Sequence, residues 1–421
     1  MSGRTPEPRR IVTMDAAVAA VAAVAPHRGS EVVPVAEAAG RTLAEDVVAT
    51  TDLPRSDVSA MDGYAVRAAD TVGATPEAPV RLRRVGGSYA GAPLEQAVGP
   101  GEAAAIATGA SVPAGADAIV LLEATTLDGD VVTLTDPGAP KHVRRRGEDV
   151  AAGTSRTPAG TRVGPAGASL LAAMGHADVP VVRPPRAAVI VTGSEVGRTA
   201  GGARDGVFDS NGPLLAALLA HLGAEVVHRD AVADDAEALA AALDRAAASG
   251  ADLIVTTGGA SVGRFDLVRR ALGADAPAGA EDAPGFDRVL VKPGGPAMLG
   301  AYGAVPWLGL PGTPVAVTVV GGLLLDAWVH AALGRRGAPA WGRPTAAVVD
   351  APVRGDAKKT ALWTAEVHVD AQGVRRAREL GRDGASRLAS LPSANGLLRL
   401  PAGASHAAGD VAEVLPAPFG A

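Results

Sequence analysis

The chain has 421 residues, more than one hydrophobic core usually serves, so several domains are expected. Apolar residues make up 48% of the chain but aromatic residues only 3%, so the cores have to be built mainly from alanine, valine and leucine. The formal charge of −6 is spread along the chain, which argues against a nucleic-acid partner. The absence of cysteine excludes disulfides, zinc–thiolate sites and a cysteine nucleophile.

The N-terminal segment contains Arg9-Arg10 followed by an Ala/Val run at 16–25, an arrangement superficially similar to a twin-arginine signal. The valines of this run follow helical spacing, and Pro26-His27 ends it as a helix stop does, so a surface-packed helix is predicted. We expect no membrane partner, because no segment reads as the roughly 18 continuous, strongly apolar residues that a membrane span needs.

A β-rich lobe is predicted at residues 53–140. Its strand-like segments, separated by Gly, Pro and Asp turns, are 80–85, 103–107, 118–122 and 131–134. The flanking residues 1–52 and 141–184 are expected to form an N-terminal linker and helical domain, with a helix at 166–174 that returns the chain to the first helix. The β lobe is then an insertion.

Between residues 185 and 334, strands alternate with helices, which predicts a doubly wound, mostly parallel α/β sheet. The expected strands are 187–191, 224–229, 253–257 and 289–291, followed by a hairpin at 298–310. The expected helices are 211–222, 234–248, 266–272 and 314–333. From residue 344 to 418 short strands return, at 346–353, 361–369, 374–380 and 397–400, and predict a small β-barrel or sandwich. The fold class is therefore α/β plus β.

Five loops are expected at the carboxyl ends of the α/β strands, where ligands bind in open α/β sheets. They are residues 192–195, 234–235, 257–263, 292–296 and 310–314. Small, backbone-exposing residues beside Lys292 suit the oxygens of a phosphate. Because Glu195, Asp234 and Asp266 would repel a phosphate by themselves, a bridging Mg²⁺ is expected with it.

Each feature has a simpler interpretation when taken alone. The glycine-rich loop can be a tight turn, Asp234 and Asp266 can be helix N-caps, and Lys292 can be a solvated surface residue. What favours a site is the arrival of all five loops at one edge. In the β lobe, Asp62-Gly63 can be a turn and Thr108 a capped turn. The scattered histidines do not indicate a metal site.

Seven strings in order resemble the molybdopterin molybdenumtransferase family, meaning the bacterial MoeA proteins and the E-domain of gephyrin. They are SAMDGYAVR, IATGA, VTGSEV, FDSNGPLL, TTGGASVGRFD, VKPGGPAMLG and GLPGTPVAV. The resemblance covers essentially the whole chain. It implies an elongated, cytoplasmic, four-domain subunit with a MogA-like α/β domain, in a homodimer whose active site is shared between subunits. It also implies Mg²⁺-assisted insertion of molybdate into adenylylated molybdopterin with release of AMP. Implied partners are a molybdopterin adenylyltransferase and cofactor-accepting molybdoenzymes.

The resemblance also implies functional roles for individual residues. The family's functional positions fall on Asp62, Thr108, Glu195, Asp234, Asp266, Arg288 and Lys292. Of these, Glu195, Asp234 and Asp266 would engage Mg²⁺ or orient water, and Asp62 would approach from the partner subunit. Arg288, where the family often has lysine, or Lys292 would contact molybdate. The pterin nucleotide would be held by Thr108, Gly258, Gly259, Ser261, Gly263, Lys292, Pro311, Gly312 and Thr313.

The chain departs from the family pattern at four positions. Gly295 replaces the second lysine of a Lys-Pro-Gly-Lys-Pro string, and Thr313 replaces an asparagine. In the C-terminal domain Thr364 stands where an arginine is expected, and Ala385, beside Ser386, stands where a serine is expected. Two other functions therefore stay open, a molybdopterin adenylyltransferase and a diverged, non-catalytic binding or scaffold protein.

Overall fold

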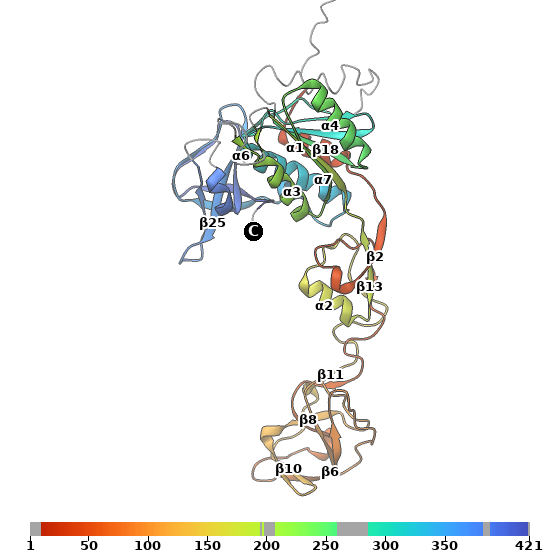
Figure 1. Ribbon diagram of the computed structural model, residues 1–421. Coiled ribbons are helices and arrows are strands. Elements are labelled where there is room, and N and C mark those ends of the chain that lie inside the picture. The colour runs from red at the N-terminus through yellow and green to blue at the C-terminus, as the bar shows by residue number, and fades with distance from the viewer. Residues whose placement is uncertain (1–9, 194–195, 198–206, 259–284, 382–387, 420–421) are drawn as a thin grey trace, which may run out of the picture. The chain divides into compact units, whose positions relative to one another are not determined.

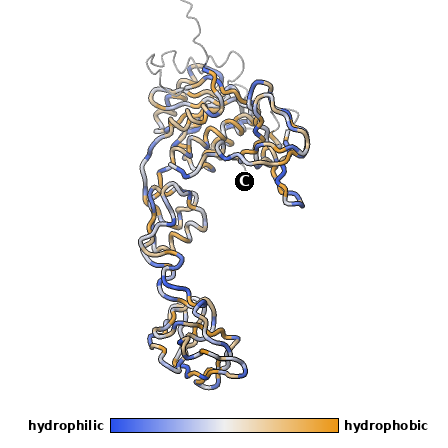
Figure 2. Tube along the Cα trace, turned by 180° about the vertical axis from the view of Figure 1, so that it is seen from behind, coloured by the Kyte–Doolittle hydropathy of each residue, from blue (hydrophilic) through white to orange (hydrophobic). Residues whose placement is uncertain are grey.

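The structure, a computed structural model, describes residues 10–193, 196–197, 207–258, 285–381 and 388–419. The chain divides into two compact units (Figure 1). The lobe unit comprises Val32–Ala39 and Glu45–Val181, and the α/β–barrel unit comprises Met1–Glu31, Gly40–Ala44 and Val182–Ala421. Figure 2 shows that polar and apolar stretches alternate along the chain in both units, as expected of short elements that each bury one face.

The lobe unit contains a six-stranded sheet in the order β8-β5-β7-β6-β10-β9. These strands are β5 (Gly63–Val66), β6 (Val80–Ser88), β7 (Glu102–Ile106), β8 (Ala118–Leu121), β9 (Thr125–Asp128) and β10 (Val131–Leu134). Four of them are predicted from the sequence, and β5 and β9 are not. β5 is missed because Asp62-Gly63 is a typical turn signal. Instead, Gly63 begins an inner strand. A Cβ on Gly63 would lie 1.9 Å from the carbonyl oxygen of Val120, so glycine is needed for β5 to pair with β8.

Short elements make up the rest of the lobe unit. Helix α2 packs against the 3₁₀ turn η1, and pairs of short strands join distant parts of the chain. These elements are β2 (Ser30–Pro34), η1 (Val35–Glu37), β3 (Val47–Val48), β4 (Val58–Ser59), η2 (Ala68–Asp70), η3 (Leu122–Ala124), η4 (Pro140–His142), β11 (Val143–Arg144), β12 (Ser155–Thr157), α2 (Pro165–Ala173) and β13 (Asp178–Val182). β2 and β13 pair with each other and carry the chain between the units.

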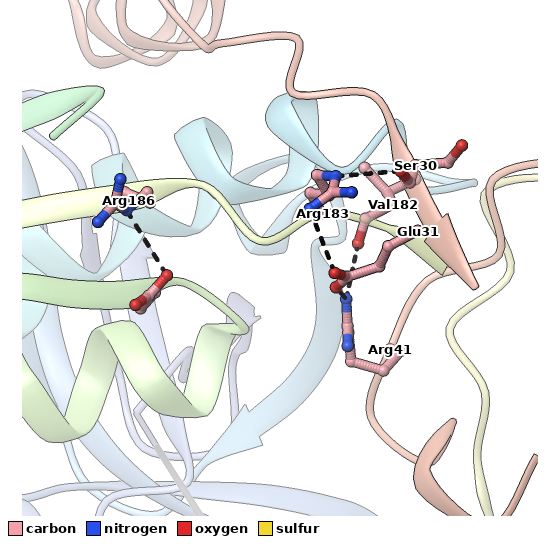
Figure 3. Close-up of polar contacts among 7 residues, drawn as sticks. Ser30, Glu31, Arg41, Val182, Arg183 and Arg186 are labelled. Atoms are coloured by element: carbon pink, nitrogen blue, oxygen red, sulfur yellow. Dashed lines mark hydrogen bonds and ion pairs between the residues drawn. The ribbon is translucent and has the colours of Figure 1, made fainter. Parts of the chain in front are cut away.

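The chain is tied down where it leaves and re-enters the α/β–barrel unit. Arg183 Nε donates a hydrogen bond to the carbonyl oxygen of Ser30 at 3.0 Å, and its Nη1 lies 3.5 Å from Glu31 Oε2 (Figure 3). Arg41 also pairs with Glu31, and its Nη2 donates to the carbonyl oxygen of Val182 at 3.1 Å. The segment around Arg183 is therefore fixed by two guanidinium groups that share one carboxylate.

The α/β sheet has the order β17-β14-β18-β22-β21. The first four strands are mutually parallel, and β21 closes the edge as the antiparallel half of the predicted hairpin. The strands are β14 (Arg186–Thr192), β17 (Glu225–Val232), β18 (Leu253–Thr257), β21 (Met298–Tyr302) and β22 (Val305–Leu310). A separate short pair is formed by β15 (Val196–Gly197) and β16 (Val207–Phe208).

Helices cover both faces of this sheet, which confirms the doubly wound fold (Figure 1). One face packs against α1 (Met14–Ala23), α3 (Asn211–Leu222) and α7 (Gly322–Ala332), and the other against α4 (Ala236–Ala248). Helix α1 is capped by Thr13, whose side chain accepts from the backbone N–H of Ala16, and it buries Met14 and Val21 in the core of the α/β–barrel unit. α1 thus belongs to the α/β–barrel unit, whereas α2 belongs to the lobe unit.

The last helix of the α/β domain is its central core element. It runs continuously as α6 (Pro314–Ala316), a π-helical turn η5 (Val317–Gly321) and α7. Contrary to the sequence expectation, this stretch, Pro314–Ala332, is long and apolar enough to cross a membrane. However, 89% of it is buried inside the protein, so its hydropathy is explained by packing against the sheet.

The predicted strand at 289–291 is wrong. Arg288–Val289 forms β19, which pairs with β1 (Ile11–Val12), and Val291–Lys292 forms β20, which pairs with the barrel strand β25. The short Val-rich run has the expected strand propensity, but its backbone groups are satisfied by two different partners outside the α/β sheet. The turn that begins at Lys292 therefore does not follow a strand of that sheet.

The C-terminal strands form a closed five-stranded barrel in the order β25-β26-β23-β29-β27, with β27 pairing back to β25. Its elements, with a neighbouring two-stranded pair and two 3₁₀ turns, are η6 (Ala340–Gly342), β23 (Thr345–Val349), β24 (Val353–Arg354), β25 (Thr360–Val369), β26 (Arg375–Glu379), η7 (Leu388–Ser393), β27 (Gly396–Leu400), β28 (Ser405–His406) and β29 (Val411–Pro416). Leu362, Leu397 and Leu415 belong to the same hydrophobic cluster as α7 and the α/β sheet, so one apolar interior runs through both domains.

Candidate functional site

Four of the five predicted loops begin at one edge of the sheet, because the parallel strands β14, β17, β18 and β22 end there. The loops after β14, β18 and β22 come into close contact. Gly258 has φ +107°, and a Cβ on it would lie 1.9 Å from the carbonyl oxygen of Thr192. A Cβ on Gly312 would lie 3.3 Å from Gly258 Cα. The glycines therefore allow three strand ends to meet closely, and such small residues suit the close approach of a phosphate to the backbone.

A hydrogen-bond network that the sequence does not reveal joins these strand ends. Asn211 Nδ2 donates to Thr257 Oγ1 at 3.1 Å and to the carbonyl oxygen of Gly312 at 2.8 Å. Thr257 Oγ1 in turn donates to the carbonyl oxygen of Pro311 at 2.8 Å. Asn211 Oδ1 and Thr192 Oγ1 are buried without a hydrogen-bond partner among the described residues. The signal for Asn211 is its place in the FDSNGPLL string, where it begins α3.

Replacing Asn211 with alanine is expected to lower the free energy of unfolding of the α/β–barrel unit by about 1–3 kcal/mol, because Gly312 and Thr257 lose a buried donor. It should also weaken binding of a phosphate-bearing ligand at this edge. Urea unfolding and equilibrium dialysis measure the two effects. Asn395→Ala is the matched control, since Asn395 also makes two hydrogen bonds, to the backbone of Val367, but is exposed and lies in the barrel. Equal ligand affinity in the two variants would contradict a role for Asn211 at this edge.

Asp234 is not the N-cap of the following helix. α4 begins at Ala236, and its N-cap is Asp235, whose Oδ1 accepts from the backbone N–H of Ala238 at 2.8 Å. The simpler interpretation of Asp234 as a capping residue is thereby removed. Asp234 lies half-buried just beyond β17, at the edge where the other strand-end loops lie.

Several predicted site residues lie outside the described part of the chain: Glu195, Gly259, Ser261, Gly263, Asp266 and the departure at Ala385. Of the three predicted magnesium ligands, Asp234 alone lies within the described ranges. Within those ranges, no three His, Asp or Glu side chains gather as a metal site requires. A single carboxylate does not define a magnesium site, so the role of Asp234 as a magnesium ligand stays a prediction.

Lys292 lies at the junction of the α/β domain and the barrel. Its Nζ is 3.5 Å from Asp356 Oδ2 and 5.9 Å from the centroid of the Trp363 ring. The turn after it packs against the helix that follows β22, because a Cβ on Gly294 would lie 2.4 Å from Val320 Cγ2. The turn that follows Lys292 therefore packs against η5, and Lys292 does not lie at the end of a strand of the α/β sheet, contrary to the sequence prediction. Arg288, also predicted, lies half-buried in β19.

Asp356 is a further residue that the sequence does not point to. The backbone N–H of Lys358, followed by the ammonium groups of Lys292 and Lys359, holds the pKa of its carboxyl below the usual range. Asp356 thus stays ionised and pairs with Lys292. Two departures from the family pattern are also placed: Thr313 is exposed just before α6, and Thr364 Oγ1 donates to the carbonyl oxygen of Leu380 at 2.7 Å within the barrel.

In the lobe unit, the structure brings together Asp62 and Thr108, which lie 46 positions apart in the sequence. Asp62 Oδ1 accepts from the backbone N–H of Thr108 at 2.7 Å and from its Oγ1 at 3.0 Å. These two hydrogen bonds, the backbone one first, hold the pKa of the Asp62 carboxyl below its usual range. Asp62 is therefore an exposed, ionised carboxylate held by Thr108.

Replacing Thr108 with valine is expected to raise the pKa of Asp62 toward its ordinary value, because the hydroxyl donor is lost while the backbone donor stays. A pH titration of the Asp62 carboxyl followed by NMR measures the shift, with Thr108→Ser as the control that keeps the donor. Since the pKa is lowered in the folded state, this bond stabilises the fold above the unfolded-state pKa and is lost as pH falls through the folded-state value. An unchanged pKa in the valine variant would contradict the assignment.

The fold and its strand-end loops define a multidomain α/β protein with a sheet edge whose chemistry suits an anionic ligand. Residues 12–175 match the MoeA N-terminal region (domain I and II), residues 188–330 a probable molybdopterin binding domain, and residues 346–417 the MoeA C-terminal region (domain IV). The chain therefore belongs to the molybdopterin molybdenumtransferase family, whose members are transferases.

Individual relatives agree with this assignment. The chain is similar to molybdopterin molybdenumtransferase 2 of Mycobacterium tuberculosis, with 43% identity over 289 residues that cover 68% of this chain and 71% of the relative. It is 32% identical to molybdopterin molybdenumtransferase of Bacillus subtilis, over 94% of this chain and 92% of the relative. A solved structure of the molybdopterin biosynthesis MoeA protein from Pyrococcus horikoshii aligns with TM-score 0.76 and 29% identity, over 97% of this chain and 99% of that chain.

Proposed function

We propose that this protein is a molybdopterin molybdenumtransferase, which inserts molybdate into adenylylated molybdopterin and releases AMP, with Mg²⁺ as cofactor, in molybdenum cofactor biosynthesis. The observation that carries the proposal is the meeting of three strand ends at Gly258 and Gly312, where glycine backbone and a helix N-terminus suit a phosphate-bearing ligand. Membership of the family supports adenylylated molybdopterin as that ligand.

We propose the following division of roles at this edge. The loop at 258–263 and the turn Pro311-Gly312-Thr313 would hold the pterin nucleotide, and Arg288 and Lys292 would supply positive charge to an oxyanion. Glu195, Asp234 and Asp266 would engage Mg²⁺, which when bound would neutralise charge between these carboxylates and the phosphate. The ionised carboxylate of Asp62, held by Thr108, would complete the site.

We propose that the protein is a cytoplasmic homodimer. Each active site would use residues of both subunits, with Asp62 and Thr108 coming from the partner subunit. It would receive its substrate from a molybdopterin adenylyltransferase and pass the product to molybdoenzymes. Mixing equal amounts of inactive Asp62→Asn and Lys292→Ala chains tests the sharing of sites. Because half of the dimers would be mixed and each mixed dimer would contain one intact site, roughly a quarter of wild-type activity is expected to return. No recovery would mean that each site is formed by a single chain.

The test of the reaction supplies adenylylated molybdopterin, Mg²⁺ and molybdate and measures AMP. We expect molybdate-dependent release of AMP by the wild-type chain and strong loss of release by Asp62→Asn and Glu195→Gln. Binding of the pterin without molybdate-dependent AMP release would instead favour the non-catalytic scaffold function. Incubation with molybdopterin and ATP is expected to give no adenylylated product, and rapid product formation would favour the adenylyltransferase.

A further inference from the structure

A second lysine lies beside Gly295, the position at which the chain lacks the lysine typical of its family. Gly295 is buried, and a Cβ on it would lie 3.9 Å from Lys359 Nζ. The same Cβ would lie 3.1 Å from the carbonyl oxygen of Val291, so a side chain at position 295 would be tightly confined. The ammonium group of Lys359 therefore lies in contact with the point at which a residue-295 side chain would begin.

Strand pairing places Lys359 there. β20 runs parallel to β25, with Val291 opposite Thr360, and the backbone N–H of Thr360 donates to the carbonyl oxygen of Leu290 at 3.1 Å. Lys359 immediately precedes β25 and is half-buried. The position of Lys359 is therefore fixed by the backbone pairing between β20, which carries Lys292, and the barrel strand β25.

The charges around this point leave an excess of positive charge. Asp356 Oδ1 accepts from the backbone N–H of Lys358 at 3.0 Å, and its Oδ2 lies 3.5 Å from Lys292 Nζ. The Lys359 ammonium also acts on the Asp356 carboxylate through its charge. One carboxylate thus faces two ammonium groups, and the Lys292 side chain is still 51% exposed. Such a pair of cations suits a dianion, since each ammonium can donate charge-assisted hydrogen bonds to its oxygens.

We propose that Lys359 takes the place of the lysine missing at position 295, and that Lys292 and Lys359 together bind a tetrahedral oxyanion. The identity of the anion, either molybdate or the phosphate of the pterin nucleotide, rests on the proposed function. Lys359 acts in this chain as a residue that determines anion affinity. The loss at Gly295 is then compensated from a segment more than sixty residues away in the sequence.

The test uses the full-length chain with Lys359→Met, which keeps an apolar stem and removes the charge, and Lys359→Arg, which keeps the charge. Lys358→Met is the matched control, since it makes the same change in net charge one position away, where the side chain is exposed and only the backbone N–H contacts Asp356. Molybdate binding is measured by calorimetry without pterin, and the KM values for molybdate and for adenylylated molybdopterin are measured from AMP release.

We expect Lys359→Met to weaken molybdate binding and raise the KM for molybdate about tenfold or more, with Lys359→Arg recovering most of the loss. A rise in the KM for the pterin nucleotide alone would support the cation pair and assign it to the phosphate. Equal affinities of Lys359→Met and Lys358→Met for both anions would overturn the inference. The calorimetric measurement needs no turnover, so a chain that binds molybdate through Lys359 but releases no AMP would contradict the proposed function and not this inference.

Discussion

Replacing Gly258 with alanine is expected to lower the free energy of unfolding of the α/β–barrel unit by roughly 3 kcal/mol or more. Two effects add at this position. The backbone has φ +107°, which a residue with a Cβ adopts only at a cost, and the new Cβ would lie 1.9 Å from the carbonyl oxygen of Thr192. Because that oxygen belongs to the backbone of β14, relief of the clash requires the strand ends to separate. Loss of pterin-nucleotide binding should accompany the loss of stability.

Tryptophan fluorescence during urea unfolding measures this change cleanly, since all four tryptophans (Trp307, Trp328, Trp341 and Trp363) lie in the α/β–barrel unit. Gly303→Ala is the matched control. Gly303 lies in the β21–β22 hairpin with φ +58°, but nothing lies within 4 Å of a Cβ there, so a cost of about 1 kcal/mol from backbone strain is expected. Equal destabilisation by the two substitutions would mean that the strand ends are not closely packed at Gly258.

Lys292→Ala is expected to reduce molybdate-dependent AMP release about 100-fold, the size of effect typical for removal of one donor to a developing or bound oxyanion. The ammonium group is lost from the junction between the two domains, and Asp356 is left with less positive charge beside it. The pKa of Asp356 should then rise toward its ordinary value, because Lys292 is one of the groups that lower it. Stability should change little, since Lys292 is half-exposed.

The assay for Lys292 compares kcat and KM for AMP release in Lys292→Ala, Lys292→Arg and Lys141→Ala. Arginine keeps the positive charge and should retain part of the activity, whereas Lys141 is an exposed lysine of the lobe unit whose removal controls for net charge. Wild-type activity of the Lys292→Ala enzyme would remove this residue from the proposed site.

The fold follows from the sequence wherever an element is specified by its own residues. α3 has the predicted bounds Asn211–Leu222, and β18 the predicted bounds Leu253–Thr257, because hydrophobic periodicity and flanking glycines define both. The sequence-based predictions fail where the structure of a segment is determined by the strand with which it pairs. The run at 289–291 has strand propensity but divides between two sheets, and Gly63 reads as a turn residue although close approach to Val120 places it in a strand.

The candidate site is predictable to a similar extent. Strand-end loops are visible in the sequence because glycine, proline and hydroxyl residues follow apolar runs. The long-range contacts of Asn211, Asp356 and Lys359 cannot be predicted from the sequence, because each joins residues 46 or more positions apart and no local pattern records such a contact. Which of two adjacent carboxylates caps α4, Asp235 and not Asp234, is likewise decided by backbone geometry.

The continuous interior of the α/β domain and the barrel bears on how this family can evolve. The clusters that hold the lobe sheet together are made only of lobe residues, such as Tyr64, Leu82 and Ile119. A sheet with an apolar core of its own can be exchanged between related genes without exposing that core. The barrel cannot, because Leu362, Leu397 and Leu415 are part of the core built around α7. Substitutions in the barrel and in Pro314–Ala332 should therefore covary across relatives, whereas substitutions in the lobe sheet should occur independently of them.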